Sequence, residues 1–138
     1  MEVHISWLAV VLATLSTMVV GSVWYARPIF GNAWMKLAKI NPKKPSSNMT
    51  SAIITTLVVS FISAFVLAHF IFLAHTFFKN SLLQDALSTS FWAWLGFTAT
   101  RFVTHDTFEG RPKMLTILNV LHEFITIMVM GLIIGLIK

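Results

Sequence analysis

The chain has 138 residues, of which 57% are hydrophobic and only 11% are charged, and its mean hydropathy is +0.80. This composition excludes an ordinary water-soluble domain and indicates a membrane protein. The net charge of +5 does not indicate nucleic-acid binding, because the basic residues flank apolar segments; anionic lipid headgroups are the expected partner. Because the sequence contains no cysteine, disulfides and thiolate chemistry are excluded.

Four apolar segments have the length and composition of membrane-spanning helices, which need roughly 20 apolar residues each. The third segment is the shortest and contains several hydroxyl side chains and an arginine. No segment alternates with period two, so the predicted fold is all-α, a single domain over residues 1–138 built as a bundle of four transmembrane helices. The predicted spans are approximately residues 5–25, 52–74, 86–103 and 114–137.

The connection between the first two spans is predicted to contain a short interfacial helix. Residues 28–40 place aromatic and apolar side chains at helical spacing, with lysines on the other faces. Such a helix lies along the membrane surface with its aromatic rings at headgroup depth. The expected interfacial anchors are Trp24, Tyr25, Phe30 and Trp34.

Lysine and arginine residues are concentrated in the first and third connections. On the opposite side only Lys79 and Lys138 are found. Because basic loops are retained in the cytoplasm, both termini of this multi-pass protein are predicted to be non-cytoplasmic. The residues that carry the bias are Arg27, Lys36, Lys39, Lys43, Lys44, Arg101, Arg111 and Lys113.

Small residues recur every four positions in the first two predicted spans. In lipid, contact between helices depends on close backbone approach, so these two stripes are expected to face each other. The alternative is that small residues are simply common in membrane helices. Gly131 and Gly135 form a GxxxG pattern in the last span, which packs either within the chain or between copies. The stripes are Ala9, Ala13, Thr17 and Gly21, and Ala52, Thr56, Ser60, Ala64 and Ala68.

The fourth predicted span carries polar side chains on one face, because Asn119, His122, Glu123 and Thr126 follow at i, i+3, i+4 and i+7. Near mid-bilayer, an ionised Glu123 costs at least a few kcal/mol. One interpretation is that this face lines a cavity and binds a proton, a cation or a polar ligand. The other is that Glu123 pairs with Arg101 or His122 only to fix the bundle, although a terminal arginine also extends readily to the interface.

Two further groups of side chains were considered as metal sites. Neither spacing demands a metal, since chance placement near helix ends and a solvated turn explain them. We therefore assign no metal site, no cofactor-binding residue and no catalytic residue from the sequence. The two groups are His4, His69 and His75, and His105, Asp106 and Glu109.

Three segments carry a family resemblance: residues 21–34 (GSVWYARPIFGNAW), 91–97 (FWAWLGF) and 108–122 (FEGRPKMLTILNVLH). They resemble a family of small prokaryotic membrane proteins catalogued as domain of unknown function 1761. The resemblance implies four helices, a location in the prokaryotic plasma membrane and a role without known activity. The matching positions are Trp24, Tyr25, Phe30, Gly31, Trp34, Phe108, Glu109, Gly110, Arg111, Pro112, Asn119 and His122.

Three classes of function fit these observations. The first is a homo-oligomeric small transporter, channel or ligand-binding bundle with its polar site on the fourth span, because four short helices alone enclose little space. The alternative is an accessory subunit of a larger membrane complex, favoured by the scarcity of structure outside the bilayer. The third, a membrane-embedded enzyme acting on lipid or quinone, would use His122 and Glu123 as acid and base, but no nucleophile motif supports it.

Overall fold

The computed structural model describes residues 4–41 and 48–137. Within these residues the chain forms helices and no strand, which confirms the all-α prediction. Three residues that contribute to the predicted orientation lie outside the described residues: Lys43, Lys44 and Lys138.

The helices follow one another with few connecting residues. They are α1 (Trp7–Trp24), the π-helix η1 (Arg27–Gly31), α2 (Asn32–Leu37), α3 (Met49–Phe78), α4 (Leu82–Ala93), the π-helix η2 (Trp94–Ala99), α5 (Thr100–Phe108) and α6 (Lys113–Leu136). Because α4, η2 and α5 are contiguous, residues 82–108 form one helical run. This run extends beyond both ends of the predicted span 86–103.

Three of the described helices, α1, α3 and α6, are each long and apolar enough to cross a membrane. Their outward surfaces carry large apolar side chains, such as Leu8 at 62% exposure and Val58 at 55%. An exposed apolar surface of this extent is typical of protein that contacts lipid rather than water. The three apolar helices and this surface together suggest a membrane protein.

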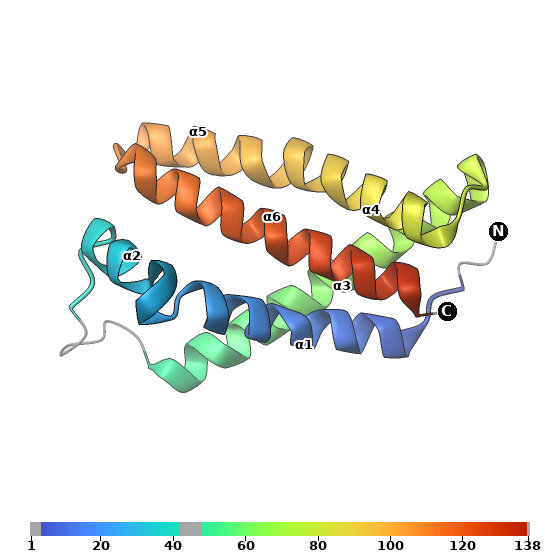
Figure 1. Cartoon of the computed structure of the whole chain (residues 1–138), viewed down its shortest axis with the longest axis horizontal. Helices are drawn as coiled ribbons and strands as arrows, with labels where there is room; N and C mark the ends of the chain where they lie inside the picture. The colour runs from blue at the N-terminus through green and yellow to red at the C-terminus, as the bar shows by residue number, and fades with distance from the viewer. Residues whose placement is uncertain (1–3, 42–47, 138) are drawn as a thin grey trace.

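Figure 1 shows α6 lying alongside α1 and the α4–α5 run, while α3 crosses the bundle obliquely. The two ends of the molecule differ in what they carry. The start of α1, the end of α6 and the α3–α4 turn lie at one end, and α2 and the α5–α6 turn lie at the other. This arrangement places the first and third connections together, as their shared basic character predicts.

Polar side chains define where several helices begin. Ser6 and Asn48 cap α1 and α3 by accepting hydrogen bonds from the backbone N–H groups two or three residues ahead, and Ser81 caps α4 in the same way. Between α5 and α6, Gly110 adopts a φ of +65°, a conformation that glycine reaches without steric cost. Pro112 then stands directly before α6, where a missing N–H costs no helical hydrogen bond.

Small side chains bring the first half of α1 together with the middle of α3. Ala9, Ala13 and Ala64 are fully buried in the core between these helices and α6. The contact continues to Thr17, whose hydroxyl donates to Ser60 Oγ at 3.1 Å. The two stripes therefore lie against each other from Ala9 to Thr17.

Beyond this point the stripes separate. Ala52 and Thr56, in the N-terminal half of α3, are exposed. Gly21 instead approaches α6, where a Cβ built on it would lie 3.7 Å from His122 Nε2. The separation of α3 from α1 leaves space for a cavity, which is described below.

The GxxxG pattern packs within the chain. A Cβ on Gly131 would overlap the Ser90 hydroxyl, and one on Gly135 would lie 2.9 Å from Ala86 Cβ. Both neighbours belong to α4, so the glycines allow α4 and α6 to approach closely. Of the two alternatives left open by the sequence, the structure has the intramolecular contact.

Candidate functional site

The polar face of α6 is built as the helical spacing predicts. Asn119, His122 and Glu123 are partly buried, and Thr126 is buried with its hydroxyl donating to the His122 carbonyl oxygen at 2.9 Å. The hydroxyl of Thr126 is thereby satisfied by its own helix. Asn119, His122 and Glu123 keep polar atoms available for groups outside α6.

His122 is the most enclosed ionisable group of this face. Its Nδ1 lies 3.2 Å from Glu123 Oε1, an interaction that is an ion pair when the imidazole is protonated and a hydrogen bond when it is neutral. Its Nε2 is buried and has no hydrogen-bond partner among the described residues. Leaving a buried polar atom unpaired costs about 1–3 kcal/mol, so this nitrogen is a natural point of attachment for a ligand or a water molecule.

Aromatic rings from the end of α1 enclose His122. The Tyr25 ring centroid lies 4.8 Å from the imidazole and the Trp24 centroid 6.2 Å from it. The Tyr25 hydroxyl also donates to Asn119 Oδ1 at 3.3 Å. Two motif positions of α1 and two of α6 therefore meet in one cluster.

The other two aromatic motif residues complete this cluster. Phe30 packs on Trp24 with centroids 4.5 Å apart, and Trp34 packs on Tyr25 at 4.9 Å. The chain can turn this tightly because Gly31 has no side chain; a Cβ there would overlap the Tyr25 carbonyl oxygen. The four aromatic residues predicted as interfacial anchors thus hold one another and His122, and their headgroup depth stays a prediction.

A cavity of about 830 Å³, here called the central cavity, lies between α1, α3 and α6. His122 and Glu123 line it together with hydroxyl side chains from all three helices and from η2. Such a wall is unusual inside an apolar bundle, because each polar group in the membrane must be satisfied locally. The serine and threonine residues of its wall are Thr17, Ser22, Thr55, Thr56, Ser60, Ser63, Thr98 and Thr126.

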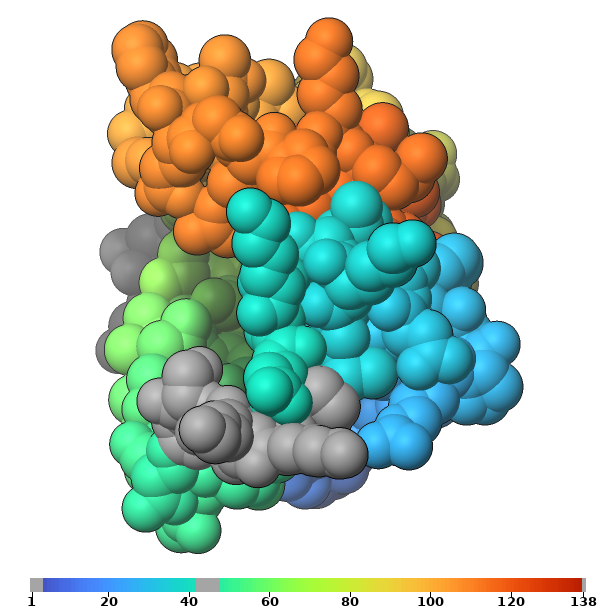
Figure 2. Space-filling view, turned by 90° about the vertical axis from the view of Figure 1, so that its left-hand side faces the viewer, coloured from blue at the N-terminus to red at the C-terminus, as the bar shows by residue number. Residues whose placement is uncertain are grey.

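A second cavity, of about 530 Å³, lies beneath α2 and is here called the end cavity. Tyr25 and Glu123 line both the end cavity and the central cavity, so these two residues stand at the junction. Asn119 and Arg111 also line the end cavity. Figure 2 looks onto this end, where α2 (cyan) sits between α1, the start of α6 and α3, and the surface is hollowed between α2 and α3.

The structure leaves Arg101 outside this site. Arg101 is exposed on α5, and the partner of Glu123 is His122. The basic side chain near the site is Arg111, which donates to Glu109 at 2.6 Å and lies 3.7 Å from the buried Asp106 carboxylate. In the sequence Arg111 is both a topology signal and a position of the family resemblance, and neither indicates that it lines a cavity together with Asn119.

Asp106 fixes the α5–α6 turn. Its Oδ2 accepts a hydrogen bond from Thr116 Oγ1 at 2.7 Å, and its backbone carbonyl accepts one from the Arg111 N–H at 2.9 Å. A buried carboxylate bonded in this way is a structural element of the hairpin. His105 is exposed beside it, and the described residues contain no group of three His, Asp or Glu side chains that could hold a metal.

At the other end of the bundle, Asp85 joins α3 to α4. Its two carboxylate oxygens accept from Asn80 Nδ2 and contact His75 Nδ1, each at 2.9 Å. These hydrogen bonds, from Asn80 first and then from His75, hold the pKa of Asp85 below its usual value. Asp85 lies one residue before the predicted span 86–103, at the level of the turn.

The other histidines do not converge on one point. The His69 Nδ1 lies 2.8 Å from the Phe65 carbonyl oxygen in its own helix, whereas His75 is bound to Asp85. His4 and His75 both line a small cavity of about 160 Å³, whereas His69 does not line it.

Comparison with known proteins identifies the family. The family model described as "Protein of unknown function (DUF1761)" matches residues 8–135, so the chain belongs to this family. The resemblance inferred from the sequence motifs is thereby confirmed. Neither the curated proteins nor the solved structures gave a significant match to the chain.

Proposed function

We propose that the chain crosses the prokaryotic plasma membrane four times, with its third span inside the helical run 82–108. This run has 27 residues at about 1.5 Å each, roughly 40 Å, which exceeds the hydrocarbon thickness of about 30 Å. The short helix α2 then lies at the cytoplasmic interface, and both termini face away from the cytoplasm. Because α2 and the α5–α6 turn lie at one end, basic residues of the first and third connections gather there, and it is their charge that supports this orientation.

We further propose that the protein binds a small ligand in the central cavity and passes it to or from the end cavity. The observation that carries this proposal is the position of Glu123, which lines both cavities and is paired with a histidine whose second nitrogen has no partner in the part of the chain that the structure describes. Ionisable groups within a membrane protein are costly and are found mainly where they serve binding or transport. A fixed structural pair would not need to stand between two cavities.

A homo-oligomer is the natural setting for this activity. The N-terminal half of α3 forms one wall of the central cavity but is largely exposed, with Ile54, Val59 and Ile62 each more than half accessible. A second copy packed against this half of α3 would close the cavity toward lipid. The assembly would gain a sealed site without any extramembrane domain.

The test is native mass spectrometry of the protein released gently from its own membranes, recording subunit stoichiometry and retained small molecules together. We expect a homo-oligomer with a bound ligand, and we expect Glu123→Gln to lose that ligand. Glu109→Gln is the matched control, because it makes the same chemical change on an exposed carboxylate that lines neither cavity. Ligand retained by Glu123→Gln would contradict the proposal, and a stoichiometric complex with other proteins would identify an accessory subunit instead.

A further inference from the structure

The central cavity continues toward the opposite end of the bundle. A cavity of about 360 Å³, here called the middle cavity, lies between α3, η2 and α6 and shares four wall residues with the central cavity. Its wall is otherwise apolar. The shared residues are Ser63, Thr98, Ile127 and Met130.

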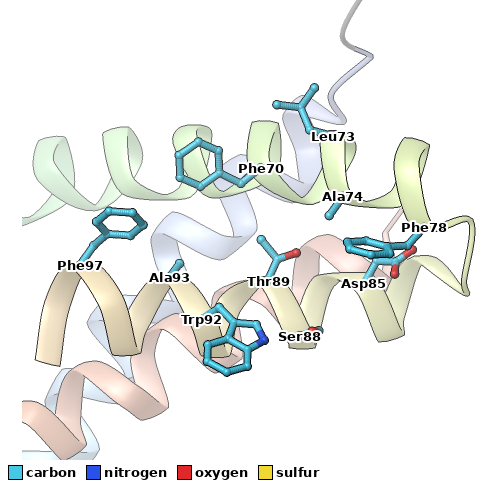
Figure 3. A pocket seen from close by; sticks show the side chains of 10 residues that line it. All are labelled: Phe70, Leu73, Ala74, Phe78, Asp85, Ser88, Thr89, Trp92, Ala93 and Phe97. Carbon is cyan, nitrogen blue, oxygen red and sulfur yellow. The ribbon is translucent and has the colours of Figure 1, made fainter.

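A further cavity of about 400 Å³, the outer cavity, lies between α3 and α4 (Figure 3). Phe70, Ala93 and Phe97 line both the middle and the outer cavity, so the two are neighbours. Figure 3 shows Phe70 and Phe97 at one end of the outer cavity and Asp85 with Phe78 at the other. Because neighbouring cavities share wall residues, the three lie in a row beside α3 from Glu123 to Asp85, and this row is here called the crevice.

The wall of this crevice carries carboxylates but no permanently positive side chain. Glu123 lies at one end beside His122 and Asp85 at the other beside His75, and among the described residues no lysine or arginine lines any of the three cavities. Asp85 is 3% exposed and is anchored by Asn80 and His75, so its carboxylate stays in a fixed position. A ligand that occupies such a crevice is expected to be a cation.

The side chains inside the crevice determine whether an inorganic or an organic cation fits it better. Between the two carboxylates the wall consists mainly of apolar and aromatic side chains, including Phe70, Phe97 and Trp92. In the middle cavity an inorganic cation would lose its hydration with only the Ser63 and Thr98 hydroxyls on the wall as side-chain replacement ligands, and the outer cavity adds only the Ser88 and Thr89 hydroxyls before Asp85. An organic cation carries its own apolar surface, and aromatic faces attract its charge.

We propose that the crevice is a binding path for lipophilic organic cations, with Glu123 and Asp85 as the two recognition points. This inference rests on the proposed function and specifies its substrate class. The π-helical segment η2 contributes to the path, because it presents Phe97 and Thr98 to the crevice from the middle of the helical run. Local π-helical geometry is frequent at functional sites.

The experiment is equilibrium dialysis of radiolabelled tetraphenylphosphonium against the full-length protein in phosphatidylcholine nanodiscs. We expect saturable binding that is weakened at least tenfold by Glu123→Gln and by Asp85→Asn, and unchanged by Glu109→Gln. The neutral analogue triphenylphosphine oxide should not compete. Competition by the neutral analogue, or binding unaffected by both carboxylate variants, would overturn the proposal.

Two outcomes separate this inference from the proposed function. Binding that depends on Glu123 but not on Asp85 would overturn the crevice while leaving the central site intact. No binding of the probe, with a native ligand still lost on Glu123→Gln, would overturn the substrate class alone. If Asp85→Asn does not fold, Phe97→Leu is the substitute test of the crevice. Phe97 is 74% exposed, so its replacement should leave the core intact and should weaken binding of the probe several-fold.

Discussion

Single residues at the α3–α4 turn make the stability of the protein depend on pH. The pKa of Asp85 is lower in the folded chain than its usual value of about 3.9, because Asn80 and His75 donate hydrogen bonds to the carboxylate. The resulting stabilisation is therefore complete above about pH 4 and is lost as the pH falls through the folded pKa. We expect the thermal unfolding midpoint in detergent to exceed that of Asp85→Asn at pH 6.

The comparison between pH values isolates this carboxylate from the others that titrate in acid. At pH 3 the difference in thermal unfolding midpoint between wild type and Asp85→Asn should be smaller than at pH 6. Tryptophan fluorescence can follow unfolding at both pH values. Carboxylates elsewhere in the chain affect both proteins equally. A gap of the same size at both pH values would show that Asp85 does not carry the acid sensitivity.

Helical periodicity was enough to place Asn119, His122 and Glu123 on one face, since that geometry is fixed within α6. The partners of these residues could not be predicted in the same way. Whether Glu123 would meet His122 or Arg101 depended on how α5 is rotated against α6, and the structure leaves Arg101 exposed. The approach of Tyr25 to His122 depends similarly on the packing of α1.

At the scale of the element, the contact between α4 and α6 depends on two glycines. A methyl group on Gly131 would overlap the Ser90 hydroxyl, so Gly131→Ala must force the helices apart. Overpacking of this kind costs about 1–3 kcal/mol. We expect Gly131→Ala to be destabilised by that amount in SDS titrations, and Ser90→Gly to restore part of the loss by removing the obstructing side chain.

A double-mutant cycle checks the assignment, because contacting residues show coupling energies of about 0.5–3 kcal/mol. Gly96→Ala is the matched control: a Cβ at Gly96 meets nothing within 4 Å, so this variant should be as stable as wild type or slightly more stable. Additive effects of Gly131→Ala and Ser90→Gly would mean that the two residues do not share the contact.

Hydropathy predicted the long helices well, because burial in lipid requires an apolar segment whatever the tertiary packing. It did not predict that residues 82–108 form one run, since the polar first turn of α4 and the polar α5 lower the hydropathy of both ends. The π-helical geometry of η2 also left no signal in the sequence. Spans are predicted from amino-acid composition, and an apolar segment has the same composition whether its backbone forms α-helical or π-helical hydrogen bonds.

The whole molecule brings separate sequence motifs together. The aromatic motif at the end of α1, the tight turn at Gly31 and the polar face of α6 meet at His122, whereas Arg111 approaches the same region from the α5–α6 turn. Each motif alone has a structural explanation in a turn or a helix contact. Their convergence around two adjoining cavities is what favours binding over a purely structural role.

The number of membrane crossings and the orientation of the molecule can be measured together, because the chain has no cysteine of its own. Gln84 and Thr107 are exposed near opposite ends of the 82–108 run, and Lys36 is exposed on α2. In intact bacterial spheroplasts, an impermeant maleimide should label Gln84→Cys but not Thr107→Cys or Lys36→Cys. The latter two should react only after permeabilisation.

Each alternative topology gives a different labelling pattern. If the 82–108 run did not cross the bilayer, Gln84→Cys and Thr107→Cys would be labelled from the same side. If the bundle were inserted in the opposite orientation, the pattern would be reversed as a whole, because α2 and the α5–α6 turn lie at the same end. Only the predicted labelling pattern places the end cavity, with Glu123 and Arg111, on the cytoplasmic side. In that topology a ligand reaches the central cavity from the cytoplasm past α2.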